Sequence, residues 1–431
     1  MSVGARLVEP LAHPPNAVVP VPGSKSIANR AMVCATLAGG ASTLTGLGPS
    51  DDTDAMLDSI RRLGADTRVE PDGGRVLIVG TAGALLPGPM ELDARLAGTT
   101  SRFVTALAAL GRGRYRIDGA APLQARPMGP LHDALARMGA TIEPEGAPGH
   151  LPVVVEAAGL RGGRVDMPGD ISSQFVTALM LVAPATAEGI DIHLTTPLVS
   201  RPYLRITAAV MRAFGIDAVS VEERRVVVGR GRYRRAEYVI EPDASSASYL
   251  WAAAAITGGR VLVPGFGPAP LQGDVAFVDL LGRMGAQIER GTEGIAVRGG
   301  GKLQGIEVDM ADCSDTVPTL AAVACFADSP TRITGVGFIR TKETDRIGSL
   351  AAELCRCGVD AQEEADGLVI RPSVAGLHGA RVRTYHDHRM AMGLALLGLR
   401  VPGVEIEDPA VVAKSFPAFW SALGALGAGH R

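Results

Sequence analysis

Aromatic residues and long apolar runs are scarce in this sequence. Phe, Trp and Tyr make up 4% of the 431 residues and the net charge is −3, whereas a nucleic-acid-binding protein usually shows a basic excess and stacking aromatics. The apolar runs are short and interrupted by Gly, Pro or charge, so we expect no membrane-spanning helix. The first twenty residues contain one Arg and no apolar core typical of a secretory signal, so we expect a cytoplasmic protein.

Cysteine is also rare and is not spaced to hold a metal. The five Cys residues form no CxxC pair and have no His at a metal-ligand spacing, and Cys355 and Cys357 are the closest two. Disulfide frameworks and structural zinc sites both require regular Cys spacing. We therefore expect reduced thiols, no metal site and no cofactor.

Lysine is the scarcest charged residue. Of the 42 basic residues, only those at positions 25, 302, 342 and 414 are Lys, and all the others are Arg. An ammonium is compact and mobile, whereas a guanidinium is a rigid planar fork. Each remaining Lys is therefore a candidate for a position that needs an ammonium, and retention by chance is the alternative.

The chain carries an internal repeat and is long enough for two domains. Six segments share a polar opening followed by an Ala/Leu/Val-rich helix that ends at Gly or Pro, and successive segments start 70 to 74 residues apart. A constant period over the whole length indicates six copies of one supersecondary unit. The six segments are 24–40, 98–113, 171–189, 244–259, 314–330 and 387–403.

Each repeat also contains a second, more charged helical segment about thirty residues further on, with short β-rich segments between. We predict the first helix to be buried, because it is apolar nearly all round, and the second to lie outside. Three repeats per domain predict an α/β protein with two similar domains. The expected domains are 23–241, with repeats 1–3, and 1–22 plus 242–431, with repeats 4–6. The clearest predicted strands are 75–80, 151–157, 224–230, 294–299 and 367–372.

The polar openings of the buried helices can be interpreted in two ways. A helix N-terminus presents free backbone N–H groups and a positive dipole end, so it favours an anion. Ser, Thr and Asp are also the residues that commonly cap helices. Both interpretations stay open for Ser101, Ser245 and Ser246, and for the similarly placed Asp243, Asp315 and Asp387.

Several short motifs concentrate groups suited to phosphate and carboxylate binding. Lys and Arg lie beside a predicted helix start in GSKSIANR (23–30), which lacks the spacing of a Walker loop. KETDR (342–346) would be a solvated patch on an ordinary helix, whereas DHRMAM (387–392) places charge directly before a buried helix. The other motifs are LAGTTSR (96–102), ARPMGPLHDAL (125–135), SSQF (172–175), SRPY (200–203) and KSFP (414–417).

Taken together, the motifs resemble those of the 5-enolpyruvylshikimate-3-phosphate synthase (3-phosphoshikimate 1-carboxyvinyltransferase) family over essentially the whole chain. The matching strings, in the family's order, are GSKSIANR, LAGT, RPMG, SSQFVTALM, SRPY, DASSASY, QGD, KETDR, DHRMAM and DP…AKSFP. The resemblance implies two domains, each of three βαβαββ units around buried parallel helices in an inside-out α/β barrel, with an active site in the interdomain cleft. It implies transfer of the enolpyruvyl group from phosphoenolpyruvate to the 5-hydroxyl of shikimate 3-phosphate, in the shikimate pathway to chorismate and aromatic amino acids.

The resemblance also implies particular site residues. Those expected to contact shikimate 3-phosphate are Lys25, Ser26, Arg30, Ser172, Ser173, Gln174, Ser200, Tyr203, Asp315 and Lys342. Those expected to contact phosphoenolpyruvate are Lys25, Gly98, Arg126, Gln174, Arg346, Arg389 and Lys414. The expected catalytic residues are Asp315, Glu343 and Lys25.

Two carboxylates suit an addition–elimination reaction, because one proton must leave the hydroxyl while another reaches the methylene carbon. Our hypothesis is that Asp315 handles the proton of the hydroxyl and Glu343 handles the proton at the methylene carbon. Lys25 and Lys342 would tune both carboxylates. Lys25 acting directly in proton transfer, or His388 doing so, are the alternatives.

The sequence departs from common family members at Leu96, where many have Asn, at Phe103, where Pro is common, and at Phe338. Some members use Asn at this last position to bind the shikimate phosphate, so Phe338 is left out of the expected site. SSQF and Gly98 are typical of the glyphosate-sensitive type. The degree of glyphosate tolerance is not predicted, because Phe103 lies beside the helix that affects it.

Three other functions compete with this interpretation. An RNA 3′-phosphate cyclase shares similar units but should show nucleotide-binding features that this sequence lacks. The UDP-N-acetylglucosamine enolpyruvyl transferases share the fold but use a loop Cys, and 99–127 contains none. A non-catalytic repeat scaffold would explain the period but not the charge at buried helix starts. We expect small-molecule substrates, no nucleic-acid or membrane partner, and a monomer.

Overall fold

The computed structural model describes residues 4–71, 73–372 and 376–427. The chain divides into two compact units. Unit 1 is Met1–Pro22 with Glu241–Arg431, and unit 2 is Gly23–Ile240. No helix in the described ranges is both long and apolar enough to cross a membrane.

Six helices of the described chain are almost wholly buried, which confirms the helices predicted from the repeat. Each is apolar on all sides, so it is stable only inside a unit. Unit 2 holds α1 (Lys25–Leu37), α3 (Gly98–Leu110) and α6 (Ser173–Val182). Unit 1 holds α8 (Ala244–Thr257), α10 (Val317–Ala324) and α12 (His388–Gly398).

The second helix of each repeat is amphipathic and has an exposed face, as predicted. Helix α2 shows how the local sequence sets the ends: Ser50 and Thr53 form a capping box, Asp51 opens the helix and Arg61 closes it, which suits the helix dipole. These helices are α2 (Asp51–Arg62), α5 (Gly129–Arg137), α7 (Pro202–Ala213), α9 (Phe277–Arg283), α11 (Arg346–Arg356) and α13 (Phe419–Ala425).

Short helical segments complete the helical part of the described chain. They connect strands to helices and are the least regular elements. They are α4 (Ala121–Gln124) and the 3-10 helices η1 (Ala183–Ala185), η2 (Gly273–Ala276), η3 (Ser314–Thr316), η4 (Gly337–Thr341) and η5 (Pro409–Lys414).

Unit 2 contains three four-stranded sheets, one for each repeat. Their strand orders are β14-β3-β5-β4, β6-β7-β9-β8 and β10-β11-β13-β12. The strands are β3 (Gly39–Thr45), β4 (Asp66–Val69), β5 (Arg75–Thr81), β6 (Met90–Asp93), β7 (Arg112–Asp118), β8 (Thr141–Pro144), β9 (Val153–Ala158), β10 (Gly163–Met167), β11 (Ile190–Leu194), β12 (Val219–Val221), β13 (Arg225–Val228) and β14 (Glu237–Val239).

Unit 1 contains two four-stranded sheets and one three-stranded sheet. Their orders are β16-β17-β15-β2, β18-β19-β21-β20 and β1-β23-β22. The strands are β1 (Arg6–Val8), β2 (Asn16–Val18), β15 (Arg260–Pro264), β16 (Gln287–Arg290), β17 (Gly294–Arg298), β18 (Glu307–Asp309), β19 (Thr331–Thr334), β20 (Asp360–Glu364), β21 (Gly367–Arg371), β22 (Arg381–Val382) and β23 (Val404–Ile406).

Each four-stranded sheet has the same pairing pattern. One edge strand joins in parallel and the other three pair antiparallel, as in β6-β7-β9-β8. The parallel edge strand of the first sheet in unit 2 is β14, which comes from the far end of that unit's sequence. No strand pairing joins one sheet to the next in the described chain, so the sheets do not close into a continuous barrel.

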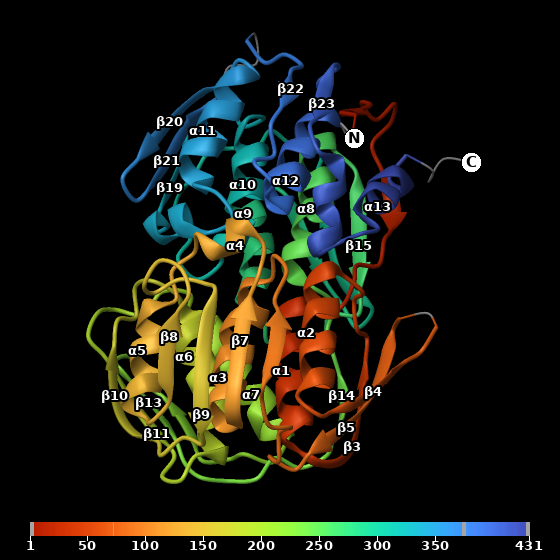
Figure 1. The fold of residues 1–431 in the computed structure, drawn as a ribbon. Helices are drawn as coiled ribbons and strands as arrows, with labels where there is room; N and C mark the ends of the chain where they lie inside the picture. Colours follow the sequence, from red (N-terminus) through yellow and green to blue (C-terminus); the bar gives the residue numbers. More distant parts are fainter. Residues whose placement is uncertain (1–3, 72, 373–375, 428–431) are drawn as a thin grey trace. The chain divides into compact units, whose positions relative to one another are not determined.

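The N-terminal residues belong to the sheets of unit 1. Strand β1 pairs antiparallel with β23, and β2 pairs in parallel with β15. The buried apolar residues accordingly form two clusters, one within each unit. Each cluster includes residues of the three buried helices of its own unit, which can be followed in Figure 1.

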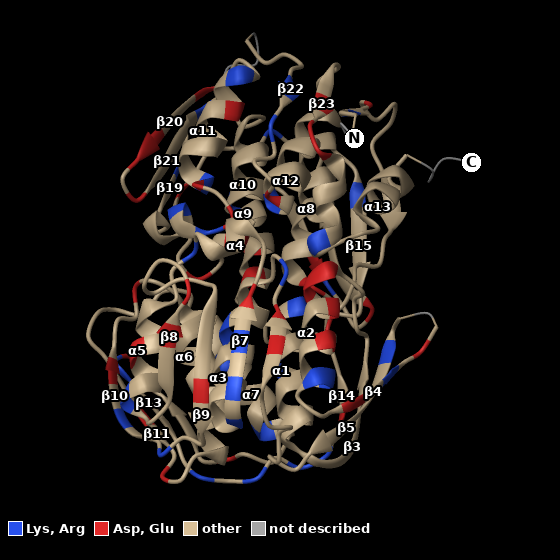
Figure 2. Cartoon of the chain, in the orientation of Figure 1, with Lys and Arg blue, Asp and Glu red and all other residues tan. Residues whose placement is uncertain are grey.

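The outward faces of the strands carry charges of both signs. On β7, Arg114 forms ion pairs with Glu143 and Glu156 of neighbouring strands at 3.2 and 3.0 Å. Figure 2 shows Lys and Arg lying near Asp and Glu over much of each unit. The charges on this face of β7 are therefore exposed and paired across the sheet.

Candidate active site

The predicted site residues fall in both units. Those in unit 2 are Lys25, Ser26, Arg30, Gly98, Arg126, Ser172, Ser173, Gln174, Ser200 and Tyr203; those in unit 1 are Asp315, Lys342, Glu343, Arg346, Arg389 and Lys414. Most lie at or just before the N-terminus of a helix.

In unit 2, polar contacts join the N-terminal parts of the buried helices. The Asn29 amide of α1 donates to the Thr99 hydroxyl of α3 at 3.3 Å. Arg30 of α1 donates to Thr177 of α6 at 3.3 Å and to Thr207 of α7 at 2.8 Å. Because these contacts are buried, they fix the helix N-termini relative to one another.

Lys25, at the start of α1, forms a shielded ion pair. Its Nζ lies 2.8 Å from Oδ2 of Asp52, whose side chain is 2% exposed. Asp52 in turn belongs to the first turn of α2, and its backbone carbonyl accepts a hydrogen bond from Thr100 of α3 at 3.3 Å. The ammonium is therefore held at one place beside the starts of two buried helices.

Gly98 lets the Arg126 guanidinium approach the start of α3. A Cβ atom at position 98 would lie 2.6 Å from Nη1 of Arg126 and 3.0 Å from its Cζ. Even Ala would therefore displace that guanidinium, so the pair keeps a cation beside a helix N-terminus.

The start of α6 offers hydroxyl and amide groups. Ser172 caps the helix and accepts a hydrogen bond from the Gln174 backbone N–H at 3.3 Å. The buried carboxamide oxygen of Gln174 has no protein hydrogen-bond partner in the described chain. Together with Ser173, this helix start could bind a hydroxylated ligand.

Arg30 is among the most deeply buried of the predicted ligands. It is 1% exposed and also donates to the backbone carbonyl of Ser26 at 2.6 Å, and burial lowers its pKa to about 10. Its guanidinium lies 5.7 Å from the ring centre of Tyr203. Ser200 adopts a positive φ of 54°, a strained conformation for a non-Gly residue that is common at functional sites. Arg30 thus contacts both the Ser26 backbone and the Tyr203 ring and helps to fix their positions.

In unit 1, one buried guanidinium connects three carboxylates. Arg346, at the start of α11 and 1% exposed, lies 2.8 Å from Asp387, 3.1 Å from Asp315 and 2.7 Å from Glu343. Burial alone would lower the pKa of Arg346, but these carboxylates raise it above its ordinary value. The cation therefore stays charged and orients both predicted catalytic carboxylates.

Asp315 is held between two guanidinium groups. Its second oxygen lies 2.7 Å from Arg389, the second residue of α12. Burial would raise the pKa of Asp315, but Arg389, Arg346 and Lys342 lower it well below its usual range. Asp315 is therefore an anion in the absence of a ligand.

Glu343 and the two nearby lysines complete the cluster. The buried ammonium of Lys414 lies 3.2 Å from Oε1 of Glu343. The ammonium of Lys342 lies 5.5 Å from the ring centre of Phe338, a cation–π distance. The KETDR motif is thus a turn between η4 and α11 with buried ion pairs, and not the solvated helix patch that was the alternative.

Two of the three Asp residues at the starts of the buried helices in unit 1 cap a helix, and the third, Asp315, does not. Asp243 accepts a hydrogen bond from the Ser246 backbone N–H at 2.8 Å, and Asp387 accepts one from Arg389 at the same distance. Both are caps, but Asp315 bonds to guanidinium groups instead. The capping interpretation is therefore confirmed for Asp243 and Asp387, although Asp387 also bonds to Arg346, whereas Asp315 bonds to two guanidinium groups.

Two residues of this arrangement were not predicted as site residues. Asp52 is 27 residues from Lys25 in the sequence, and Asp387 is 41 residues from Arg346. The pattern of helix starts indicates a cap at Asp387 and nothing at Asp52, and it gives no information about which cation either carboxylate meets.

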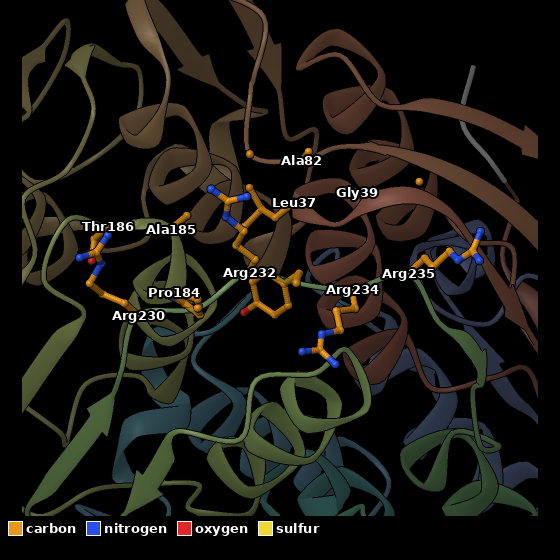
Figure 3. Close-up of a pocket in the computed structure, with 14 residues that line it drawn as sticks. Leu37, Gly39, Ala82, Pro184, Ala185, Thr186, Arg230, Arg232, Arg234 and Arg235 are labelled. Atoms are coloured by element: carbon orange, nitrogen blue, oxygen red, sulfur yellow. The ribbon is translucent and has the colours of Figure 1, made fainter.

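A large hollow in unit 2 lies away from these residues. It measures about 870 Å³ and is lined at the C-terminal ends of α1 and α6, by Leu37 and Thr186 among others. Figure 3 shows that its arginines, such as Arg230 and Arg232, point in different directions. Because the helix C-termini are the negative ends of the dipoles, this hollow does not match the helix starts described above.

The arrangement matches a known family. A sequence model of EPSP synthase (3-phosphoshikimate 1-carboxyvinyltransferase) matches residues 12–423. This chain belongs to the EPSP synthase family. A 3-phosphoshikimate 1-carboxyvinyltransferase from Nostoc sp. is 41% identical over 412 residues, which cover 95% of this chain and 96% of that protein. One from Methanoculleus marisnigri is 41% identical over 413 residues, with the same coverage.

The fold comparison agrees with this EPSP synthase assignment. The crystal structure of EPSP synthase from Acinetobacter baumannii superimposes with a TM-score of 0.82 at 27% identity, covering 98% of each chain. The two-domain α/β fold class predicted from the sequence is therefore confirmed, and the chain is an enzyme of the EPSP synthase family.

Removing the Asp387 carboxylate should destabilise the protein far more than removing an ordinary cap. The Asp387→Ala variant loses a helix cap and the partner of a buried guanidinium, so we expect the free energy of unfolding to fall by about 3–5 kcal/mol. The matched Asp243→Ala variant also loses the cap of a buried helix, for about 1 kcal/mol. Urea denaturation of both variants measures the difference, and equal losses would show that the Arg346 contact does not stabilise unit 1.

Proposed function

We propose that this chain transfers the enolpyruvyl group of phosphoenolpyruvate to the 5-hydroxyl of shikimate 3-phosphate and releases phosphate. The observation that carries the proposal is the pair of carboxylates, Asp315 and Glu343, held on one buried guanidinium. That pair supplies two proton-transfer groups, and family membership supplies the reaction. Residues of both units take part.

The cations are the groups that we propose for anion binding. Phosphoenolpyruvate carries a phosphate and a carboxylate, which guanidinium forks and ammonium groups bind strongly. Four cations lie at or near helix ends. The guanidinium of Arg126 lies beside Gly98 at the start of α3, and each of the other three forms an ion pair with a carboxylate. These pairs are Arg389 with Asp315, Lys25 with Asp52 and Lys414 with Glu343. Arg346 already bonds to three carboxylates, so fewer of its N–H groups remain for a direct contact with phosphoenolpyruvate.

Substrate binding would turn Asp315 into a better base. Arg389 and Arg346 lower its pKa in the free enzyme, which makes it a weak proton acceptor. If the substrate carboxylate takes over part of the charge of Arg389, the pKa of Asp315 rises toward the range in which it can accept the 5-hydroxyl proton. The base is therefore activated only when the substrate is present.

Glu343 is the group that we propose for the methylene carbon. One oxygen bonds to Arg346 at 2.7 Å and the other lies 3.2 Å from Lys414. In the addition step Glu343, in its protonated form, gives its proton to that carbon while Asp315 takes the 5-hydroxyl proton. In the elimination step Glu343 takes a proton back from the new methyl group, and Asp315 gives its proton to the departing phosphate. Asp315 reverses its role in the same way, so the proton count of the pair is restored after each turnover.

Replacing Glu343 by Gln should abolish most of the activity while leaving binding intact. Gln keeps the size of the side chain but cannot carry the proton, so kcat should fall by about 10²–10⁴-fold. Release of phosphate from phosphoenolpyruvate plus shikimate 3-phosphate measures the rate, and calorimetry measures shikimate 3-phosphate binding.

A matched control is Glu307→Gln, which changes a carboxylate of β18 in the same unit that is 69% exposed. It should leave kcat unchanged. Wild-type turnover by Glu343→Gln with intact binding would contradict the assignment of the proton. Phosphate release by the wild-type chain with UDP-N-acetylglucosamine, but not with shikimate 3-phosphate, would contradict the proposed substrate.

We also propose that the chain acts as a monomer in the cytoplasm. The support is the mixture of charges over the surface and five free thiols, of which Cys34, Cys313, Cys325 and Cys357 are buried. Light scattering should give a mass near the 44.5 kDa of one chain. A mass of twice that value at micromolar concentration would exclude the monomer.

A further inference from the structure

Asp274 is a buried carboxyl of unit 1 that lies outside the residues described so far. It belongs to η2, is 4% exposed, and its Oδ2 accepts a hydrogen bond from the Ser245 hydroxyl of α8. Its other oxygen is buried without a hydrogen-bond partner, and Asp274 has no ion pair in the described chain. An ionised carboxylate is far more costly in such a place than a neutral carboxylic acid.

The surroundings of Asp274 add negative charge. Its 3-10 helix packs against η3, which carries Asp315, and against α8. Burial, the Asp315 charge and Asp243 raise the pKa of Asp274 to about 7, although Ser245 and Arg389 act in the opposite direction. The difference from Asp315, whose pKa is lowered, has a geometric cause: the guanidinium groups contact Asp315 directly and Asp274 only from a distance.

The other titratable groups near Asp274 do not supply a counter-charge. Cys313 precedes η3, and burial together with the Asp274 charge raises its pKa to about 12, so it stays a neutral thiol. On α9, Asp279 forms an exposed ion pair with Arg290 at 2.6 Å. In the described chain, Arg389 is the cation whose charge lowers the pKa of Asp274, and it is already bonded to Asp315.

We propose that Asp274 is a positioning residue whose neutral form beside Asp315 leaves the Arg389 guanidinium to Asp315 and the anionic substrate. If Asp274 ionised, it would compete with Asp315 for Arg389 and would repel an incoming anion. The catalytic part of this inference rests on the proposed function, whereas the protonation of Asp274 does not.

Stability against pH tests the protonation directly. A carboxyl whose pKa is raised from 3.8 to about 7 in the folded state stabilises the protein fully below pH 4 and loses that contribution as the pH rises to 7. The isosteric Asp274→Asn variant lacks this loss. We expect its melting temperature, relative to wild type, to rise steadily between pH 5 and 7 and to level off above pH 7.

The matched control is Asp279→Asn, an exposed carboxyl on the next helix, for which the difference from wild type should not follow this curve. A constant difference between Asp274→Asn and wild type from pH 5 to 8.5 would overturn the proposal. If that variant does not fold, Ser245→Ala replaces it. Loss of the hydroxyl removes a contact that lowers the pKa of Asp274. The pH range over which the melting temperature falls should therefore extend to higher pH in Ser245→Ala than in wild type. The same range in both proteins overturns the proposal.

Kinetics test the positioning role. Between pH 6 and 8.5, the KM of wild type for phosphoenolpyruvate should rise at least about threefold more than that of Asp274→Asn, because only wild type gains a negative charge near Arg389. The ratio of kcat at the two pH values should change much less. Equal KM profiles would exclude the role in substrate binding. Absence of phosphate release by wild type would refute the proposed function, and the melting curves would still decide the protonation state of Asp274.

Discussion

The contact of one buried guanidinium with three carboxylates is the constraint on which unit 1 depends. A guanidinium that is 1% exposed is tolerated because Asp387, Asp315 and Glu343 surround it. Its planar fork also sets the directions in which Asp315 and Glu343 can point. The same interaction therefore stabilises the start of α12, through its cap Asp387, and places the two carboxylates proposed for proton transfer.

Unit 2 also positions cations at the starts of its buried helices, but with fewer ion pairs than unit 1. Its buried helices begin at Lys25, Gly98 and Ser173, and the free N–H groups of these ends favour anions. Asp52 fixes the ammonium, and the absence of a side chain at position 98 admits the Arg126 guanidinium. The two units thus share one plan, in which buried helices direct their positive ends to a set of polar side chains, but unit 1 adds carboxylates that can exchange protons.

The repeat made the fold predictable, because a helix that is apolar all round must be buried and a constant period implies equivalent units. The site residues were predicted through ten motifs in a fixed order. What a linear pattern could not give is long-range pairing: β14 beside β3, Asp387 beside Arg346, or Ser245 beside Asp274. Asp274 lies in the QGD string, but only its burial distinguishes it from an ordinary surface acid.

The central claim is that the geometry of Arg346, and not its charge alone, makes the carboxylate pair reactive. The Arg346→Lys variant keeps the charge but replaces the fork by one ammonium, which cannot bond to three carboxylates in fixed directions. Phosphate release from phosphoenolpyruvate and shikimate 3-phosphate is the direct measurement. We expect kcat to fall by at least about 100-fold in a variant that remains folded by circular dichroism. A folded variant with wild-type kcat would contradict the account.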